Sequence, residues 1–218
     1  MNGRFVTLLA AAAFGSATLF GTTVTVSLGS NPFPNGNSSP YIATVGGVTE
    51  LVYCDDDTHT VYANESWTAT VTSFNSVVSN IASTSVEFKG LPNSTTLYEQ
   101  AAWLVFQFAT HPLADATGIQ AALWDLMTQV NPGSSSNQTT AGYWYSQAIL
   151  AANYNSLTAT QKAELVILTP VLNSQNPLSY GTPQEMFAIA PEPGTYALFG
   201  MGLLLLSLGT FRRRNKVN

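Results

Sequence analysis

Hydrophobic and polar residues alternate in the first third of the chain, a pattern typical of half-buried β-strands. The alternation is clearest in residues 23–27 and 68–72. Residues 51–62 have the pattern of a strand, an acidic turn and a second strand, and residues 67–78 continue with β-branched and aromatic residues. The sequence therefore predicts a strand-rich N-terminal part.

The hydrophobic period changes to that of helices near residue 98. Four helices are predicted, over residues 98–110, 117–130, 143–152 and 158–172. Thr158 is the expected N-cap of the last helix, and Pro170 would kink or end it. A closing strand is expected at residues 185–189. Together these elements predict an α+β fold in which a helical part follows the strand-rich part within one unit.

The C-terminal segment has a different pattern. Pro191, Glu192 and Pro193 precede an apolar run over residues 196–211, which ends at Arg212, Arg213 and Arg214. About 16 apolar residues are slightly fewer than a membrane span usually needs. The arginines would keep the C-terminus in the cytoplasm, so the run is predicted to be a single transmembrane helix. An ordinary tail anchor is the alternative.

The N-terminus has the order of a secretory signal peptide. Arg4 precedes an apolar run over residues 5–14, and small residues follow up to Gly21. A transmembrane helix fits less well, because the run is short and no charged residue stops it. The domains expected are therefore a signal peptide at 1–21, an exported domain at 22–190 and a C-terminal segment at 191–218.

The exported part is acidic and poor in cations. Of the seven Lys and Arg residues, only Lys89 and Lys162 lie between the two terminal segments, whereas eleven of the twelve acids lie there. A surface with this balance would repel phosphate backbones, so nucleic acid is excluded as a partner.

Cys54 is the single cysteine of a chain that is predicted to be exported. It cannot form an intramolecular disulfide. The open alternatives are a buried small hydrophobe, an intermolecular disulfide, a nucleophile or a covalent cross-link. Neither His59 nor His111 lies in a protease motif, and the acids at 55–57 disfavour a thiolate. A hydrolytic thiol enzyme is therefore not expected.

Gln120 and Trp124 lie one turn apart, on the flank of a core stripe within the helix predicted at 117–130. The structural alternative for Gln120 is a capping box with Thr117. The structural alternative for Trp124 is an ordinary core aromatic residue.

Other chemistry has weaker support. Asp115 and Asp125 have no recognisable catalytic spacing, and a solvated surface is the expected role of both. The acids at 55–57 lack the glycine and distal glutamate of an EF-hand loop, so no metal and no cofactor are predicted. Exposed aromatic residues could stack on sugars in a noncovalent carbohydrate-binding protein; the candidates are Trp67, Tyr143, Trp144 and Tyr145.

The order of Pro191-Glu192-Pro193, apolar helix and Arg212-Arg213-Arg214 closely resembles the PEP-CTERM sorting signal of Gram-negative bacteria. The resemblance implies that an exosortase-type membrane protease cuts near residues 191–193. The inner membrane would then hold only the precursor, and the mature protein would reach the cell surface or extracellular matrix.

Tyr53-Cys54, followed by Ile119-Gln120-x-x-Leu123-Trp124, resembles the thioester domains of bacterial surface adhesins. This resemblance implies an internal thioester between Cys54 and Gln120, which Tyr53 and Trp124 would shield from water. An amine or hydroxyl on a partner polymer would later take the acyl group. Such a linkage is used once, so the protein is not expected to be an enzyme. Known members are mostly Gram-positive wall proteins, and this chain departs from them in its sorting signal.

Overall fold

Six antiparallel strands close into a barrel in the order β1-β2-β3-β6-β5-β4. The first four strands are consecutive in the sequence, and the last two follow the helices and complete the ring. Their bounds are β1 (Thr23–Leu28), β2 (Tyr41–Val45), β3 (Val48–Cys54), β4 (Ser66–Ser73), β5 (Leu165–Pro170) and β6 (Met186–Ile189).

The computed structural model describes residues 21–30, 32–34, 38–111, 113–129, 138–172 and 181–189. These residues belong to one unit, Phe20–Ala190. The predicted signal peptide, apart from Gly21, and the predicted sorting segment at 191–218 lie outside the described residues. Among the helices that are described, none combines the length and the hydropathy needed to span a bilayer.

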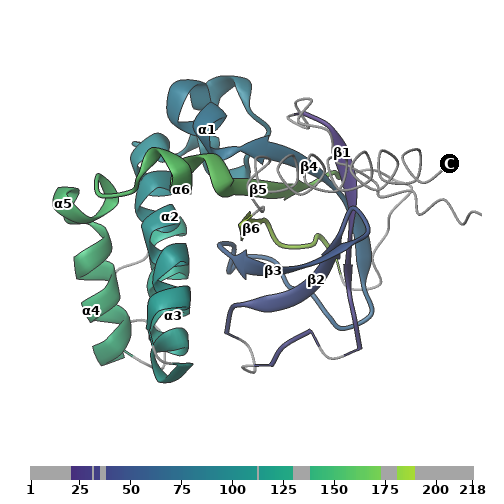
Figure 1. Cartoon of the computed structure of the whole chain (residues 1–218), viewed down its shortest axis with the longest axis horizontal. Helices are drawn as coiled ribbons and strands as arrows, with labels where there is room; N and C mark the ends of the chain where they lie inside the picture. The colour runs from purple at the N-terminus through teal and green to yellow at the C-terminus, as the bar shows by residue number, and fades with distance from the viewer. Residues whose placement is uncertain are drawn as a thin grey trace, which may run out of the picture. The chain divides into compact units, whose positions relative to one another are not determined.

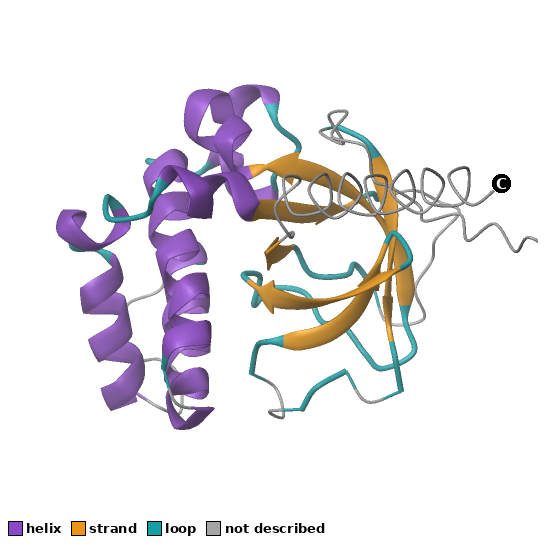
Figure 2. Cartoon of the chain, viewed as in Figure 1, coloured by secondary structure: helices purple, strands orange, loops and turns teal. Residues whose placement is uncertain are grey.

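The helices gather on one side of the barrel (Figures 1 and 2). The three longest described helices, α2 (Ser94–Thr110), α3 (Ala116–Met127) and α4 (Gln138–Ala148), pack on one another. Shorter helical segments lie between these helices or between them and the strands: α1 (Phe74–Asn80), η1 (Ile81–Ser83), η2 (Glu87–Gly90), η3 (Leu113–Asp115), α5 (Ala151–Tyr154) and α6 (Ala159–Glu164).

Gly118 allows α3 and α4 to approach closely. A Cβ added at Gly118 would lie 2.8 Å from the Thr140 Cβ atom, which is closer than side-chain atoms normally approach. The glycine is therefore required by the packing of the helices.

Two apolar clusters fill the unit, and β3 contributes to both. All six strands contribute to the cluster inside the barrel, where Val52 and Cys54 lie. Tyr53 points to the opposite face and joins the cluster between barrel and helices, with Leu104 and Ile119. Successive residues of a strand face opposite sides, so the end of β3 belongs to the barrel interior and to the helical layer at once.

The α+β class predicted from the sequence is confirmed, as are a helix in each predicted helical region, the Thr158 N-cap and the closing strand. Thr158 forms a capping box with Gln161 at the start of α6. Residues 186–189 form β6, which pairs with both β3 and β5.

Three boundaries predicted from the sequence are wrong. The second strand expected up to residue 62 does not form, because residues 55–65 make a loop held by side-chain hydrogen bonds. Residues 74–78 are helical, because Ser73 caps α1 by accepting a hydrogen bond from Ser76 N–H. The helix expected at 158–172 ends at Glu164, where the apolar run of β5 pairs with β4 and β6.

Candidate functional site

Cys54 is the last residue of β3 and is fully buried. Its position is fixed by pairing with Met186 of β6. The thiol donates a hydrogen bond to the Asp56 carbonyl oxygen, with Sγ and O 3.1 Å apart. It also accepts one from the Trp124 indole, with Nε1 and Sγ 3.4 Å apart. The sulfur is thus held on two sides.

Gln120 comes to this thiol from α3 and is 1 % exposed. Its Nε2 donates to the Cys54 carbonyl oxygen at 2.7 Å. Its Oε1 accepts from the Ser39 backbone N–H at 3.0 Å. The Cys54 N–H in turn donates to Ser39 Oγ at 2.9 Å. We call this closed ring of hydrogen bonds, formed by Cys54, Gln120 and Ser39, the thiol–amide site.

The capping-box alternative for Gln120 is wrong. The N-cap of α3 is Asp115, and no side chain caps the helix there. The Gln120 amide instead bonds to two backbone groups that lie outside its own helix. A buried amide used in this way connects the helical layer to the end of β3.

The two predicted shielding residues lie on different sides of β3. Trp124 is half-buried, packs against the barrel cluster and contacts the sulfur. Tyr53 lies on the other face of the strand and stacks on Phe108 of α2, with ring centroids 5.3 Å apart. Tyr41, which the sequence did not single out, is close enough to Cys54 to interact with it electrostatically.

The surroundings keep the thiol protonated. Burial raises the pKa of Cys54 well above its usual value, and the nearby carboxyls of Asp55 and Asp56 raise it further. The hydrogen bond that the sulfur accepts from the Trp124 indole lowers the pKa, but its effect is smaller than that of burial. A free thiolate is therefore disfavoured, so any reaction of the sulfur requires its proton to leave in the same step.

This arrangement contains the parts needed for acyl transfer to sulfur. A soft nucleophile and an amide are held together away from water. An N–H group is already aimed at the amide oxygen, where negative charge would develop during attack. The same hydrogen bonds of the buried amide would also stabilise the fold if no reaction took place.

The acids of the predicted acidic turn at 55–57 differ in their exposure to solvent. Asp55 and Asp56 are fully buried, and only Asp57 is exposed. Asp125 is also buried, which contradicts its expected place on a solvated surface.

Of the aromatic residues considered for sugar stacking, Trp67 and Trp144 belong to the apolar clusters. Tyr145 is half-buried and Tyr143 is exposed.

Sequence reasoning missed three residues that matter here. Ser39 comes from a loop with no motif, and Glu87 and Glu185 come close to the loop after β3 only through the fold. The predicted sorting residues, Pro191 to Pro193 and Arg212 to Arg214, lie outside the described residues. Comparison of the chain with protein-family models, with curated proteins and with solved structures found no match.

Proposed function

We propose that this chain is an exported surface or matrix protein that forms an internal thioester between Cys54 and Gln120. The observation that carries the proposal is the thiol–amide site, in which the Gln120 amide bonds to the backbone of Cys54 itself. The neighbouring Ser39 N–H, 3.0 Å from Gln120 Oε1, supports it further.

In the proposed reaction, Cys54 Sγ attacks the side-chain carbonyl carbon of Gln120. Negative charge develops on Oε1, where the Ser39 N–H stabilises it. The carbon–nitrogen bond then breaks, Nε2 leaves as ammonia with the thiol proton, and a sulfur–acyl bond remains. Holding the two groups together replaces a bimolecular encounter, an effect worth up to roughly 7–11 kcal/mol in ideal cases.

The stored acyl group would then react once with an outside nucleophile. An amine or hydroxyl on a surface or matrix polymer attacks the same carbon, Gln120 becomes covalently attached to the polymer, and the Cys54 thiol is released. Trp124 covers the sulfur until then. The reaction consumes the protein's own bond, so the protein is not an enzyme with turnover.

The terminal segments supply the location in this proposal. A signal peptide at 1–21 exports the chain. A PEP-CTERM signal with its transmembrane helix holds the precursor in the inner membrane of a Gram-negative bacterium until an exosortase-type protease cuts near Pro191–Pro193. A thioester-domain-like unit would then give the released protein a covalent means of staying at the surface.

A noncovalent surface protein is the competing function, and the same hydrogen bonds favour it. In that case Gln120 only satisfies the buried backbone groups of Ser39 and Cys54, and the thiol remains free. The two functions differ in one covalent bond, so detecting that bond distinguishes them.

Trypsin digestion followed by mass spectrometry tests the bond directly. Lys89 and Lys162 are the basic residues between the terminal segments, so cleavage after them separates Cys54 from Gln120. A thioester would join the two peptides, with a mass lower than their sum by one ammonia. Methylamine should release the link and add itself to Gln120.

Cys54→Ala and Gln120→Ala should each abolish the joined peptide. Gln100→Ala is the matched control, because Gln100 is also a buried helical glutamine, and it should leave the link intact. Separate peptides of full mass in the unreacted wild-type protein, with a thiol that titrates after denaturation, would overturn the proposal.

A further inference from the structure

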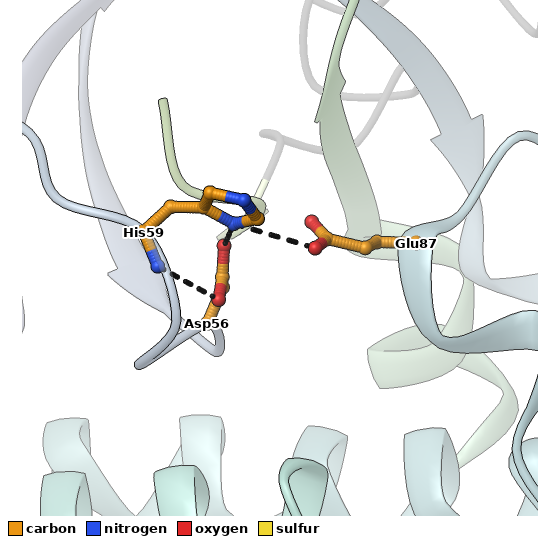
Figure 3. A group of neighbouring side chains, drawn as sticks. All are labelled: Asp56, His59 and Glu87. Carbon is orange, nitrogen blue, oxygen red and sulfur yellow. Dashed lines mark hydrogen bonds and ion pairs between the residues drawn. The ribbon is translucent and has the colours of Figure 1, made fainter. Parts of the chain in front are cut away.

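Three side chains with metal-binding atoms converge beside the loop that follows β3. Asp56 and His59 come from this loop, and Glu87 comes from η2. Figure 3 shows their carboxylate and imidazole ends turned toward one another. One ligand atom from each lies within 4.8 Å of the others. We call these three residues the Asp–His–Glu cluster.

One nitrogen of the imidazole faces both carboxylates. His59 Nδ1 is 2.5 Å from Asp56 Oδ2 and 3.4 Å from Glu87 Oε1. The contact with Asp56 is a short hydrogen bond, whereas Glu87 Oε1 is farther from the same nitrogen. A divalent cation that replaced the proton between Nδ1 and Asp56 Oδ2 would bind both carboxylates and the imidazole together.

The geometry of Asp56 leaves one oxygen available for such an ion. Its Oδ1 accepts hydrogen bonds from the backbone N–H and the hydroxyl of Thr58, at 2.7 and 2.6 Å, whereas Oδ2 bonds to His59. Gln184 fixes the same loop, because its Nε2 donates to the carbonyl oxygens of Asp56 and His59. Supporting bonds of this kind orient metal ligands in proteins.

A separate observation concerns the buried carboxyl of Asp55. Asp55 is fully buried, and neither of its carboxylate oxygens accepts a hydrogen bond from another residue in the described part of the chain. Its carboxyl lies close enough to Glu185, Asp56 and Glu87 to interact electrostatically with all three. A buried carboxyl without a partner is costly unless a cation compensates it.

The two lysines in the described part of the chain have partners elsewhere. Lys89 donates to the Thr84 carbonyl oxygen, and Lys162 pairs with Glu99 at 3.2 Å. Glu185 is already bound by the hydroxyls of Tyr98 and Thr169, which are neutral donors. Among the residues that the structure describes, the imidazole of His59 is thus the one basic group that lies among these carboxyls.

We propose that Asp56 Oδ2, His59 Nδ1 and Glu87 bind a Zn²⁺ ion, with water completing its coordination. One imidazole and two carboxylates form a ligand set that suits zinc, whereas calcium and magnesium prefer oxygen ligands alone. The Asp56 carbonyl oxygen also accepts the Cys54 thiol hydrogen bond. An ion in the cluster would therefore also fix the carbonyl group that accepts the hydrogen bond of the thiol.

This site does not depend on the thioester, and the experiment keeps the two apart. The full-length protein, without a polyhistidine tag and with Cys54→Ala, is titrated with ZnCl₂ in a calorimeter. Binding of one ion per chain is expected. His59→Gln should weaken it by at least about tenfold, since a ligand is lost.

The matched control is His111→Gln, which changes the chain's other histidine, located at the edge of Trp144. It should leave zinc affinity unchanged. Glu87→Gln provides a second ligand variant at a partly exposed position, and circular dichroism checks that each variant is folded. Absence of zinc binding, or equal binding by the His59→Gln and His111→Gln proteins, would overturn the proposal. Tighter binding of Ca²⁺ than Zn²⁺ would overturn the assignment of the ion.

Discussion

The thiol–amide site and the Asp–His–Glu cluster share the segment from residue 54 to residue 59, which contributes Cys54 to the first and Asp56 and His59 to the second. The polar groups of the two sites nevertheless differ in how well they are hydrogen-bonded. In the thiol–amide site, the Gln120 amide, the Ser39 N–H and the Cys54 backbone satisfy one another. Around the Asp–His–Glu cluster, acidic groups outnumber basic ones among the described residues, and neither carboxylate oxygen of Asp55 accepts a hydrogen bond from another of these residues.

The difference indicates what each site can do. A site whose groups already satisfy one another supports a reaction within the chain, such as a bond between Cys54 and Gln120. A site where buried carboxyls gather can be stabilised by something from outside, and a cation is the simplest choice. Asp56 belongs to both, because its carbonyl oxygen accepts from the thiol while its carboxylate faces His59.

The largest effect should follow from removing the Gln120 amide in a protein that cannot form the thioester. In a Cys54→Ala background, Gln120→Leu leaves the Ser39 N–H and the Cys54-position carbonyl buried without partners. Each such group costs about 1–3 kcal/mol, so a loss of about 3 kcal/mol is expected. Urea unfolding measures it.

Gln107→Leu in the same background is the control for that change. The Gln107 amide bonds to the Trp103 carbonyl within α2, so its loss should cost less than about 1 kcal/mol. Equal losses in the two variants would show that Gln120 does not join the helices to β3.

A smaller effect, of opposite sign, is expected near the Asp–His–Glu cluster. In protein freed of metal with a chelator, Asp55→Asn keeps the shape of the side chain and removes a buried negative charge. Burial and the carboxyl of Glu185 already raise the pKa of Asp55 well above its usual value. The free energy of unfolding should therefore increase by about 2 kcal/mol.

Asp57→Asn serves as the comparison, because this neighbouring residue is exposed. It should change the free energy of unfolding by less than about 0.5 kcal/mol. If Asp55→Asn instead destabilised the metal-free protein, the Asp55 carboxylate would have a compensating partner, and the contrast between the two sites would disappear.

The sequence predicted the class of fold and most elements, and its error at β5 has a clear physical cause. Residues 165–170 were expected to extend a helix from Thr158, since a short apolar run fits either period. They form β5 because β4 and β6 lie on both sides to pair with them. Local pattern cannot contain that information, whereas the Thr158 capping box lies within four residues and was predictable.

The residues of the candidate sites also divide into those that the sequence predicted and those that it did not. Cys54, Gln120 and Trp124 were grouped by the resemblance to thioester domains, and the structure brings them together. Ser39 and Glu87 were missed, because each reaches its site only through contacts between distant parts of the chain. The buried state of Asp55 was also unpredictable, since three consecutive acids normally indicate a solvated turn.

The smallest effect separates the two roles of Ser39. Ser39→Ala removes the hydroxyl that accepts from the Cys54 N–H, at a cost of about 1 kcal/mol. The backbone N–H that donates to Gln120 Oε1 remains, so the thioester between Cys54 and Gln120 should still form.

Ser38→Ala is the matched control, because the Ser38 hydroxyl makes only a 3.2 Å bond to Thr117 in the part of the chain described. Urea unfolding and trypsin mapping of both variants give the comparison. A folded Ser39→Ala protein without the link would mean that the hydroxyl takes part in acyl transfer. The hydrogen bonds of the thiol–amide site would then serve the reaction more than the stability of the fold.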